Sequence, residues 1–423
     1  MKETFEALKK YNFWDKKNQK DDFEVGFERV FYLKKIEQFL ENDLIKVFIG
    51  QRRVGKSYIL RQIMKKLLIS GVKEKNIFYL NKEIVDFDKI RTHLDLKKII
   101  DIYKNEIKPQ GKIYYFFDEI QEVKNWEKIV NSLSQDYKYK AEVFISGSNS
   151  KMLSGELATY ISGRYVDFEI FPFSYDEYVE YFGLKKNKET FLGYLHDGGL
   201  PEFLQLKTEE SKRYYLQALK STIVLKDIVD RYKIQDIKLL EKILDFVSDN
   251  IGNIFSTAKV TNFLKSRGNK ISFDTVSNYL KYLSETFLIY EVERFDLKGR
   301  EILESGKKYY LNDLSFCNFV FSSFDDGVGG HLENLVYLHF RSNDWKVYVG
   351  KIASSEIDFV IEKENQKKYI QVAYALTDKK VIEREFGNLE KIKDSHEKIV
   401  ITLDDKSLGN RNGIEHKLAW EVL

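Results

Sequence analysis

The stretch that decides the fold is 44-LIKVFIGQRRVGKSYILRQIMKKLL-68. It opens with an apolar run from Leu44 to Ile49, which is typical of a buried strand. Apolar residues then recur at helical spacing from Ile59 to Leu68. Between the two segments lies the loop Gly50-Gln51-Arg52-Arg53-Val54-Gly55-Lys56-Ser57. The stretch therefore predicts a strand, a glycine-containing loop and a helix, in that order.

The loop has the spacing G-x-x-x-x-G-K-S, which is typical of a phosphate-binding loop. Its glycines let the backbone curl so that N–H groups point at phosphate oxygens, and the helix N-terminus adds a favourable dipole. Lys56 then reaches the β- and γ-phosphates, and Ser57 ligates Mg²⁺. We therefore predict ATP and Mg²⁺ as ligands. The residues predicted to contact the nucleotide are Gly50, Gln51, Arg52, Arg53, Val54, Gly55, Lys56, Ser57 and Tyr58.

Two acidic residues end a later predicted strand. The apolar segment 112-KIYYFFDEI-120 follows another predicted strand, 77-IFYLN-81, and carries Asp118 and Glu119 at its end. In phosphoryl-transfer sites of this type, the first acid orders the metal and the second activates water. We predict that Asp118 binds Mg²⁺ together with Ser57, and that Glu119 is the catalytic base. The pair favours a hydrolase over a protein that only binds nucleotide.

A fourth strand, 142-EVFISGSNS-150, ends in small polar residues. Ser146, Ser148 or Asn149 is placed to sense the γ-phosphate, and Asn149 is our catalytic candidate; turn and capping chemistry is the open alternative. After a predicted helix at 151–161, Arg164 precedes a fifth strand, 165-YVDFEIF-171. This is where AAA+ ATPases commonly place an arginine finger, although arginines also cap helices. Whether Arg164 acts within one subunit or across two stays open.

The strings GQRRVGKS, FFDEIQEVKNW, ISGSNSKML, SGRYVDFEIFPFSYDEY and GGLPE together resemble a known family. They are similar to widespread prokaryotic ATPases, distant AAA+ relatives, that carry a C-terminal domain with a restriction-endonuclease-like fold. The resemblance covers about residues 29 to 405. It implies an α/β fold with a P-loop parallel sheet first and a nuclease-like α/β domain last, and the pattern of the middle segment predicts a winged-helix module between them. We predict domains at 1–175, 176–305 and 306–423.

The middle segment has three helical stretches, 237–252, 257–268 and 272–287, followed by the strand-like 288–297. Three helices and a β-ribbon are a winged-helix layout. The third stretch has an apolar stripe formed by Val276, Tyr279, Leu280, Leu283 and Phe287. Its other side carries Thr275, Asn278, Lys281 and Tyr282, which are placed to read a DNA groove. Because the excess of basic residues is slight, a mechanical or interdomain role stays the alternative.

The order of elements from 332 to 405 resembles the PD-(D/E)xK nuclease core. The resemblance implies a metal site from Glu333, from Asp358 and from a Glu-x-Lys motif, but the motif's place is taken by Gln371-Val372-Ala373. A neutral amide replaces one acidic ligand, and a methyl group replaces the lysine that would stabilise developing charge. We predict a vestigial site that does not cut DNA. Lys379 or Lys380 is the alternative source of the missing charge.

The composition sets outer limits on function. The net charge is only +3, so any nucleic-acid binding must be local. The single cysteine, Cys317, excludes an intrachain disulfide. We see neither a secretory signal nor a membrane span and expect a cytoplasmic protein. The predicted function is an ATP-hydrolysing switch or motor, expected to form a homo-oligomer. The alternatives are a DNA-directed effector and a signalling scaffold with slow turnover; DNA and a protein are the partners considered.

Overall fold

The computed structural model describes residues 1–14, 23–136, 138–153, 161, 163–321 and 328–423. The chain forms two compact units, Met1–Ile170 and Phe171–Leu423. The division lies close to the predicted boundary at 175/176. The second predicted boundary, at 305/306, falls inside strand β7 (Glu301–Leu311). The two C-terminal segments separated in the prediction therefore contribute to one sheet.

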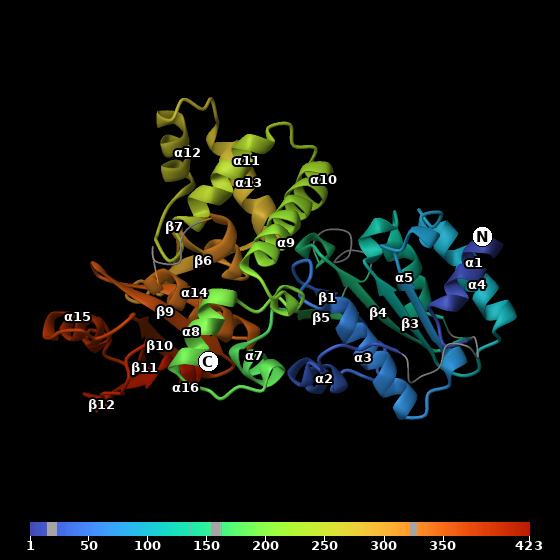
Figure 1. The fold of residues 1–423 in the computed structure, drawn as a ribbon, viewed down its shortest axis with the longest axis horizontal. Helices are drawn as coiled ribbons and strands as arrows, with labels where there is room; N and C mark the ends of the chain where they lie inside the picture. The colour runs from blue at the N-terminus through green and yellow to red at the C-terminus, as the bar shows by residue number, and fades with distance from the viewer. Residues whose placement is uncertain (15–22, 137, 154–160, 162, 322–327) are drawn as a thin grey trace. The chain divides into compact units, whose positions relative to one another are not determined.

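The first unit is built on a five-stranded parallel sheet of order β2-β3-β4-β1-β5 (Figure 1). Every pairing in it is parallel. Because β1 lies between β4 and β5, and β3 lies beside β4, the loops after β1, β3 and β4 leave the sheet at the same edge. The strands are β1 (Ile45–Ile49), β2 (Ile77–Asn81), β3 (Ile113–Asp118), β4 (Ala141–Gly147) and β5 (Tyr165–Glu169).

Two groups of helices cover this sheet, because its central strands are apolar on both faces and must be buried on both. In one group α2 packs on α3; in the other, α1 and α5 pack on α4. Figure 1 shows the sheet between the two groups. The helices are α1 (Lys2–Lys10), α2 (Val30–Glu37), α3 (Lys56–Ile69), α4 (His93–Glu106) and α5 (Trp126–Ser134), with short 3₁₀ turns η2 (Glu74–Asn76), η3 (Val85–Phe87), η4 (Ile120–Glu122) and η5 (Ser150–Leu153). Of the helix predicted at 151–161, residues 154–160 lie outside the described residues.

The second unit contains an eight-stranded sheet of order β12-β13-β11-β10-β9-β8-β6-β7. Its strands, besides β7, are β6 (Ile289–Asp296), β8 (Lys346–Ile352), β9 (Ser355–Lys363), β10 (Gln366–Val372), β11 (Glu397–Thr402), β12 (Asn410–Arg411) and β13 (Ile414–Leu418). Before the sheet come α7 (Tyr175–Phe182), α8 (Lys188–Asp197), the 3₁₀ turn η6 (Phe203–Gln205), α9 (Glu209–Thr222), the π-helical η7 (Ile223–Val229), α10 (Asp230–Tyr232), α11 (Ile237–Ser248), α12 (Thr257–Ser266) and α13 (Phe273–Glu285). Later come the π-helical η8 (Cys317–Phe321), α14 (Val328–Ser342), α15 (Lys379–Glu390) and α16 (Ala419–Val422).

The order α11, α12, α13, β6, β7 matches the three helices and ribbon predicted from the sequence. The apolar stripe of α13 is buried, as expected. The ribbon, however, does not stand alone as a wing would. β6 pairs in parallel with β8 over Arg294–Asp296, so the ribbon is the edge of the eight-stranded sheet.

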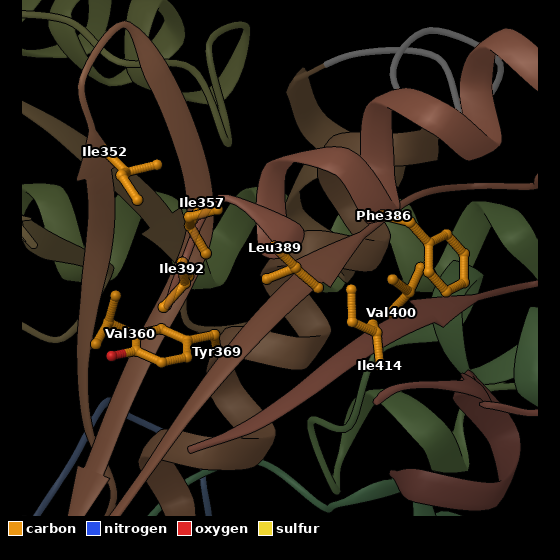
Figure 2. Close-up of a cluster of buried hydrophobic side chains, with 9 residues drawn as sticks. All are labelled: Ile352, Ile357, Val360, Tyr369, Phe386, Leu389, Ile392, Val400 and Ile414. Atoms are coloured by element: carbon orange, nitrogen blue, oxygen red, sulfur yellow. The ribbon is translucent and has the colours of Figure 1, made fainter. Parts of the chain in front are cut away.

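Helix α15 covers part of that sheet through an apolar core (Figure 2). Phe386 and Leu389, three residues apart on the helix, are fully buried against side chains from the strands. The cluster consists of Ile352, Ile357, Val360, Tyr369, Phe386, Leu389, Ile392, Val400 and Ile414. It fixes α15 beside the strand ends that carry Asp358 and Gln371. No helix in the described part of the chain is long and apolar enough to cross a bilayer.

Candidate nucleotide site and a second lysine–carboxylate centre

The loop after β1 has the backbone that a phosphate-binding loop requires. Gly50 has φ +147°, and a Cβ there would lie 2.3 Å from the carbonyl oxygen of Ile170. Gly55, just before α3, has φ +99°. Lys56 is buried and donates from Nζ to the carbonyl oxygens of Gly50 and Gln51, both at 3.0 Å. Its ammonium is therefore held by neutral acceptors, which phosphate oxygens can replace with stronger charge-assisted bonds.

Asp118 ends β3 and is completely buried beside this loop. The Ser146 hydroxyl donates to its Oδ1, and the Tyr79 hydroxyl donates to its Oδ2 at 3.1 Å. Burial, and then the neighbouring Glu119 carboxylate, raises the pKa of Asp118, while a hydrogen bond from Ser57 opposes that shift. Ser57 and Asp118 thus bring a hydroxyl and a carboxylate oxygen together. Oxygen ligands of this kind are what Mg²⁺ prefers, so the residues present fit the predicted ion.

Glu119 follows directly in a left-handed conformation, with φ +53°. This conformation is uncommon for a residue other than glycine and is concentrated at functional sites. Its backbone N–H donates to Ser146 Oγ at 3.0 Å, and Gln121 Nε2 donates to its Oε2 at 2.5 Å. Its Oε1 lies 3.7 Å from Lys56 Nζ. Burial would raise the pKa of Glu119, but the charges of Lys56 and Arg52 outweigh burial and hold it below its usual value. The carboxylate is therefore ionised, as a base must be.

The remaining predicted loop residues differ in their surroundings. Arg52 is buried and pairs with Glu83 Oε1 at 2.5 Å, whereas Arg53 is exposed with φ +71°. Tyr58 is half-buried, with the Arg61 guanidinium 5.1 Å from its ring centre. The side chains of Gln51 and Val54 are buried. Besides Lys56, Arg52 is thus the loop side chain whose charge acts on Glu119.

Of the three small polar residues at the end of β4 and just beyond it, Ser146, inside the strand, contacts both acids. The Ser148 hydroxyl also helps to lower the pKa of Glu119. Asn149 Oδ1 accepts from the backbone N–H of Lys151 at 2.7 Å, which is the turn chemistry considered as the alternative. Its Nδ2 is buried without a hydrogen-bond partner among the described residues. A donor is therefore left available, and the sensing role of Asn149 stays a prediction.

Arg164 lies where the sequence places it, at the start of β5. Its side chain is exposed, and its carbonyl oxygen accepts from the N–H of Ile45 at 2.9 Å. The pairing anchors the backbone of Arg164 to β1 while the guanidinium faces solvent. Residues 154–160 and 162, which precede it, lie outside the described residues.

The predicted vestigial site contains a lysine that sequence reasoning missed. Lys308 of β7 donates from Nζ to Glu333 Oε1 at 2.8 Å, and its Nζ lies 3.4 Å from Asp358 Oδ1. A third carboxylate, Glu356, has its Oε1 2.6 Å from the same Nζ. Gln371 is buried, and its Oε1 has no hydrogen-bond partner in the part of the chain that is described.

Lys379 and Lys380, the alternative source of charge, are both exposed. The positive charge beside these carboxylates belongs instead to Lys308 on β7, which lies far earlier in the chain. Burial would lower the pKa of Lys308, but the surrounding carboxylates outweigh it and raise that pKa. Burial also raises the pKa of Glu333, to about 7, against the pull of Lys308. Among the described residues, no group of three or more His, Cys, Asp or Glu side chains is arranged to hold a metal ion.

The fold and the first site define an AAA+-like P-loop nucleotide-binding protein. Residues 42–179 match the family described as AAA domain, and residues 188–326 match a domain of unknown function, DUF8612. An uncharacterized protein of Haemophilus influenzae is 34% identical over 375 residues, covering 88% of this chain and 92% of that protein. An uncharacterized protein of Methanocaldococcus jannaschii is 34% identical over 391 residues, covering 88% of this chain and 84% of that one. The chain belongs to the family that these two proteins represent, and its residues 42–179 carry the AAA-domain match.

Solved structures with partial likeness include two nucleotide-related proteins. The Walker-type ATPase PABY2304 of Pyrococcus abyssi has a TM-score of 0.48 and 15% identity, covering 70% of this chain and 95% of that one. AMPPCP-bound DnaA of Aquifex aeolicus has a TM-score of 0.32 and 17% identity, covering 65% and 93%. Scores this low carry no functional argument. The winged-helix and restriction-endonuclease-like assignments stay predictions.

Proposed function

We propose that this protein binds and hydrolyses ATP and works as a nucleotide-dependent conformational switch or motor. The observation that supports this most strongly is the meeting of two strand ends. Lys56 Nζ, after β1, lies 3.7 Å from Glu119 Oε1, after β3. Asp118 and Ser57 are in contact beside them. A phosphate-binding cation, an ionised base and two metal-type ligands are thus assembled at one edge of the sheet.

In the proposed reaction, each residue has a separate task. Lys56 exchanges its two backbone carbonyls for β- and γ-phosphate oxygens, and the N–H groups of the loop bind the same phosphates. Ser57 and Asp118 would hold Mg²⁺, which supplies neutralising charge to the phosphates when bound. Glu119 accepts a proton from the attacking water, and ADP and phosphate leave.

The pairing of Lys56 with Glu119 gives this chemistry a natural order. While the site lacks phosphate, the ammonium and the carboxylate attract each other across 3.7 Å. Phosphate oxygens compete for the ammonium, so nucleotide binding frees Glu119 to face water. Gln121 and Ser146 keep hold of Glu119 during this exchange through the side-chain and backbone bonds described above. We propose both as positioning residues.

Steady-state hydrolysis and nucleotide binding test this function. Lys56→Ala is expected to lose ATP affinity, and Glu119→Gln to retain bound ATP without turnover. Matched controls are Lys65→Ala, an exposed lysine on the same helix, and Glu122→Gln, an exposed acid three residues beyond the base. Wild-type protein that binds ATP but scarcely hydrolyses it would favour the signalling scaffold. Hydrolysis at the wild-type rate by Glu119→Gln would remove the proposed base.

A neighbouring subunit is proposed to complete the site through Arg164. Its guanidinium is exposed at the start of β5, so it is free to reach outward. An arginine finger supplied by another subunit is worth roughly 10³ or more in rate. Arg164→Ala should therefore be inactive alone and be partly rescued by Lys56→Ala subunits, which still carry the finger. Arg91→Ala, another exposed arginine of the first unit, is the control. A strictly monomeric, fully active ATPase would contradict this proposal.

A DNA-directed role is the second candidate, and the exposed cations on α13 and in the loop between α12 and α13 favour it. Arg267, Lys270 and Lys281 are all exposed, and Asn278 is exposed beside them on α13. Tyr282, which was expected to face outward, instead stacks on Tyr232 with ring centres 3.8 Å apart. Fluorescence anisotropy with duplex DNA at low and high salt, and hydrolysis with and without DNA, test this role. A Lys281→Ala variant that binds DNA as the wild type does would exclude α13 as the reader.

A further inference from the structure

Lys308 is a buried cation in the sheet of the second unit. Only 2% of its side chain is exposed, and its Nζ lies 2.6, 2.8 and 3.4 Å from carboxylate oxygens of Glu356, Glu333 and Asp358. These carboxylates come from β9 and α14, while the lysine comes from β7. A buried charge is tolerated only when it is paired, and this one has three partners.

The carboxylates are also satisfied by other groups of the same chain. The Tyr310 hydroxyl donates to Glu333 Oε1 at 2.5 Å. The backbone N–H of Val372 donates to Asp358 Oδ2 at 2.9 Å. Asp358 therefore has one oxygen engaged by the ammonium and the other by β10. Glu356 keeps 39% of its side chain exposed, so water completes its solvation.

The position of Nζ has the properties of a cation site. Oxygens from two separate elements converge on one point, as the ligands of a hard cation do. The Glu333 distance of 2.8 Å matches N⁺–H···O⁻ bonds of about 2.7–2.9 Å, and all three distances exceed the roughly 2.0–2.1 Å of Mg²⁺ ligands. The oxygens are thus spaced for an ammonium, which agrees with the absence of a metal-binding group among the described residues.

We infer that Lys308 is a tethered cation that takes the place of a divalent metal ion in this carboxylate cluster. It closes the cluster to metal, and its charge holds β9 and α14 against β7. The inference is independent of ATP hydrolysis in the first unit. It predicts that removing the ammonium uncovers a divalent-cation site formed by Glu333, Glu356 and Asp358.

The test is a titration of the nucleotide-free full chain with Mn²⁺. Electron paramagnetic resonance measures the Mn²⁺ that stays free, and the bound amount is the difference. Lys308→Met keeps an unbranched side chain, one atom shorter than lysine, and removes its charge. It is expected to bind one Mn²⁺ per chain more than the wild type, and the added Asp358→Asn substitution should abolish that gain. The matched control is Lys307→Met, because Lys307 lies next to Lys308 but pairs with Glu291 instead. A folded Lys308→Met protein that binds no additional Mn²⁺ would overturn the inference.

Thermal unfolding keeps the inference testable if Lys308→Met does not fold without metal. Mn²⁺ should then raise the melting temperature of Lys308→Met, or restore its cooperative transition, and leave Lys307→Met unchanged relative to the wild type. If Lys308→Met folds under neither condition, Asp358→Asn in the presence of Lys308 decides. Its melting temperature should fall by the same amount in EDTA and in Mn²⁺, because it loses a lysine partner and no metal ligand. A fall that depends on Mn²⁺ would show a metal site in the wild type and overturn the inference.

Discussion

The two units each place a buried lysine among carboxylates, but the lysines have different partners. Lys56 gives its two hydrogen bonds to the backbone carbonyls of Gly50 and Gln51, and its nearest carboxylate oxygen, on Glu119, lies 3.7 Å away. Lys308 lies within 3.4 Å of three carboxylates. The first ammonium is held by weak, neutral acceptors and the second by charges.

This difference decides which lysine can exchange its partners. A phosphate that approaches Lys56 replaces bonds to neutral carbonyl oxygens with bonds to a charged acceptor, so the attraction of opposite charges is added to each hydrogen bond. An anion that approaches Lys308 must displace buried carboxylates that would be left without a counter-charge. The same side chain is therefore a ligand-binding group in one unit and a structural one in the other.

The largest expected effect tests the first centre, which is the group formed by Lys56, Ser57, Asp118 and Glu119. Glu119→Gln should lower kcat by about 10²–10⁴, because an amide cannot take the proton from water, while ATP stays bound. Single-turnover hydrolysis and nucleotide binding on the same preparation measure the two quantities. Glu122→Gln should hydrolyse ATP at the wild-type rate. Equal losses in both variants would mean that charge in this region, and not a base at Glu119, sets the rate.

The next effect tests the second centre, which is Lys308 with the carboxylates of Glu333, Glu356 and Asp358. Asp358→Asn should lower the free energy of unfolding of the second unit by about 3–5 kcal/mol, because it breaks a buried ion pair and leaves Lys308 with fewer partners. Urea denaturation measures the change. Glu362→Gln, on the same strand, breaks the half-exposed pair with Lys367 and should cost about 1 kcal/mol or less. If Asp358→Asn lowers the free energy of unfolding no more than this control does, ion pairs with Lys308 do not stabilise the second centre.

A smaller effect separates the two lysines directly. Lys56→Ala should weaken ATP binding roughly 10- to 100-fold, since it loses one charged partner worth about 1.5–3 kcal/mol. It should change the free energy of unfolding less than a substitution at Lys308, because the lost bonds go to neutral carbonyls and Arg52 still provides a positive charge for Glu119 when the 3.7 Å contact with Lys56 is removed. Lys308→Met should show the reverse pattern. Isothermal titration with ATP and urea denaturation of both variants give the comparison, and a loss of ATP affinity in Lys308→Met would break it.

The first centre was predictable from sequence because its parts lie within short, spaced motifs. The loop from Gly50 to Ser57, the strand before it and the helix after it are contiguous, and Asp118 ends an apolar run. The three small polar residues Ser146, Ser148 and Asn149 left an ambiguity, because the sequence pattern alone also fits a turn or a helix cap. The structure resolves part of it, because Ser146 alone contacts both acids. The hydrogen bond from Gln121 to Glu119 was not predicted. Glu119 has a left-handed backbone there, and the spacing of residues in the sequence does not indicate that conformation.

The second centre was only half predictable. Glu333 and Asp358 were found by the order of elements, but Lys308 lies on β7, which joins the sheet through β6 and its parallel pairing with β8. No motif connects positions so far apart in the chain. The available signal was the lysine itself, since 308-KYYL-311 places a charge at the start of an apolar run. A lysine inside a strand that is otherwise buried requires an acidic partner.

The smallest effect is a dependence of stability on pH that originates at Glu333. Burial raises its pKa from 4.5 to about 7 in the folded protein. Between these values the folded chain keeps a proton that the unfolded chain releases, so the contribution is fully present below about pH 4.5 and is lost as the pH rises through 7. The slope of the free energy of unfolding against pH is at most about 1.4 kcal/mol per pH unit.

The pKa of Asp313 is raised in the same direction, to about 6, so the measurement must be the difference between the wild type and a variant that lacks the Glu333 carboxyl. Urea denaturation of wild type and Glu333→Gln from pH 5 to 8 supplies it: the wild type should lose stability with rising pH faster than the variant. Parallel curves would mean that Lys308 and Tyr310 keep Glu333 ionised throughout, and that the second centre carries three full negative charges around its lysine at every pH tested.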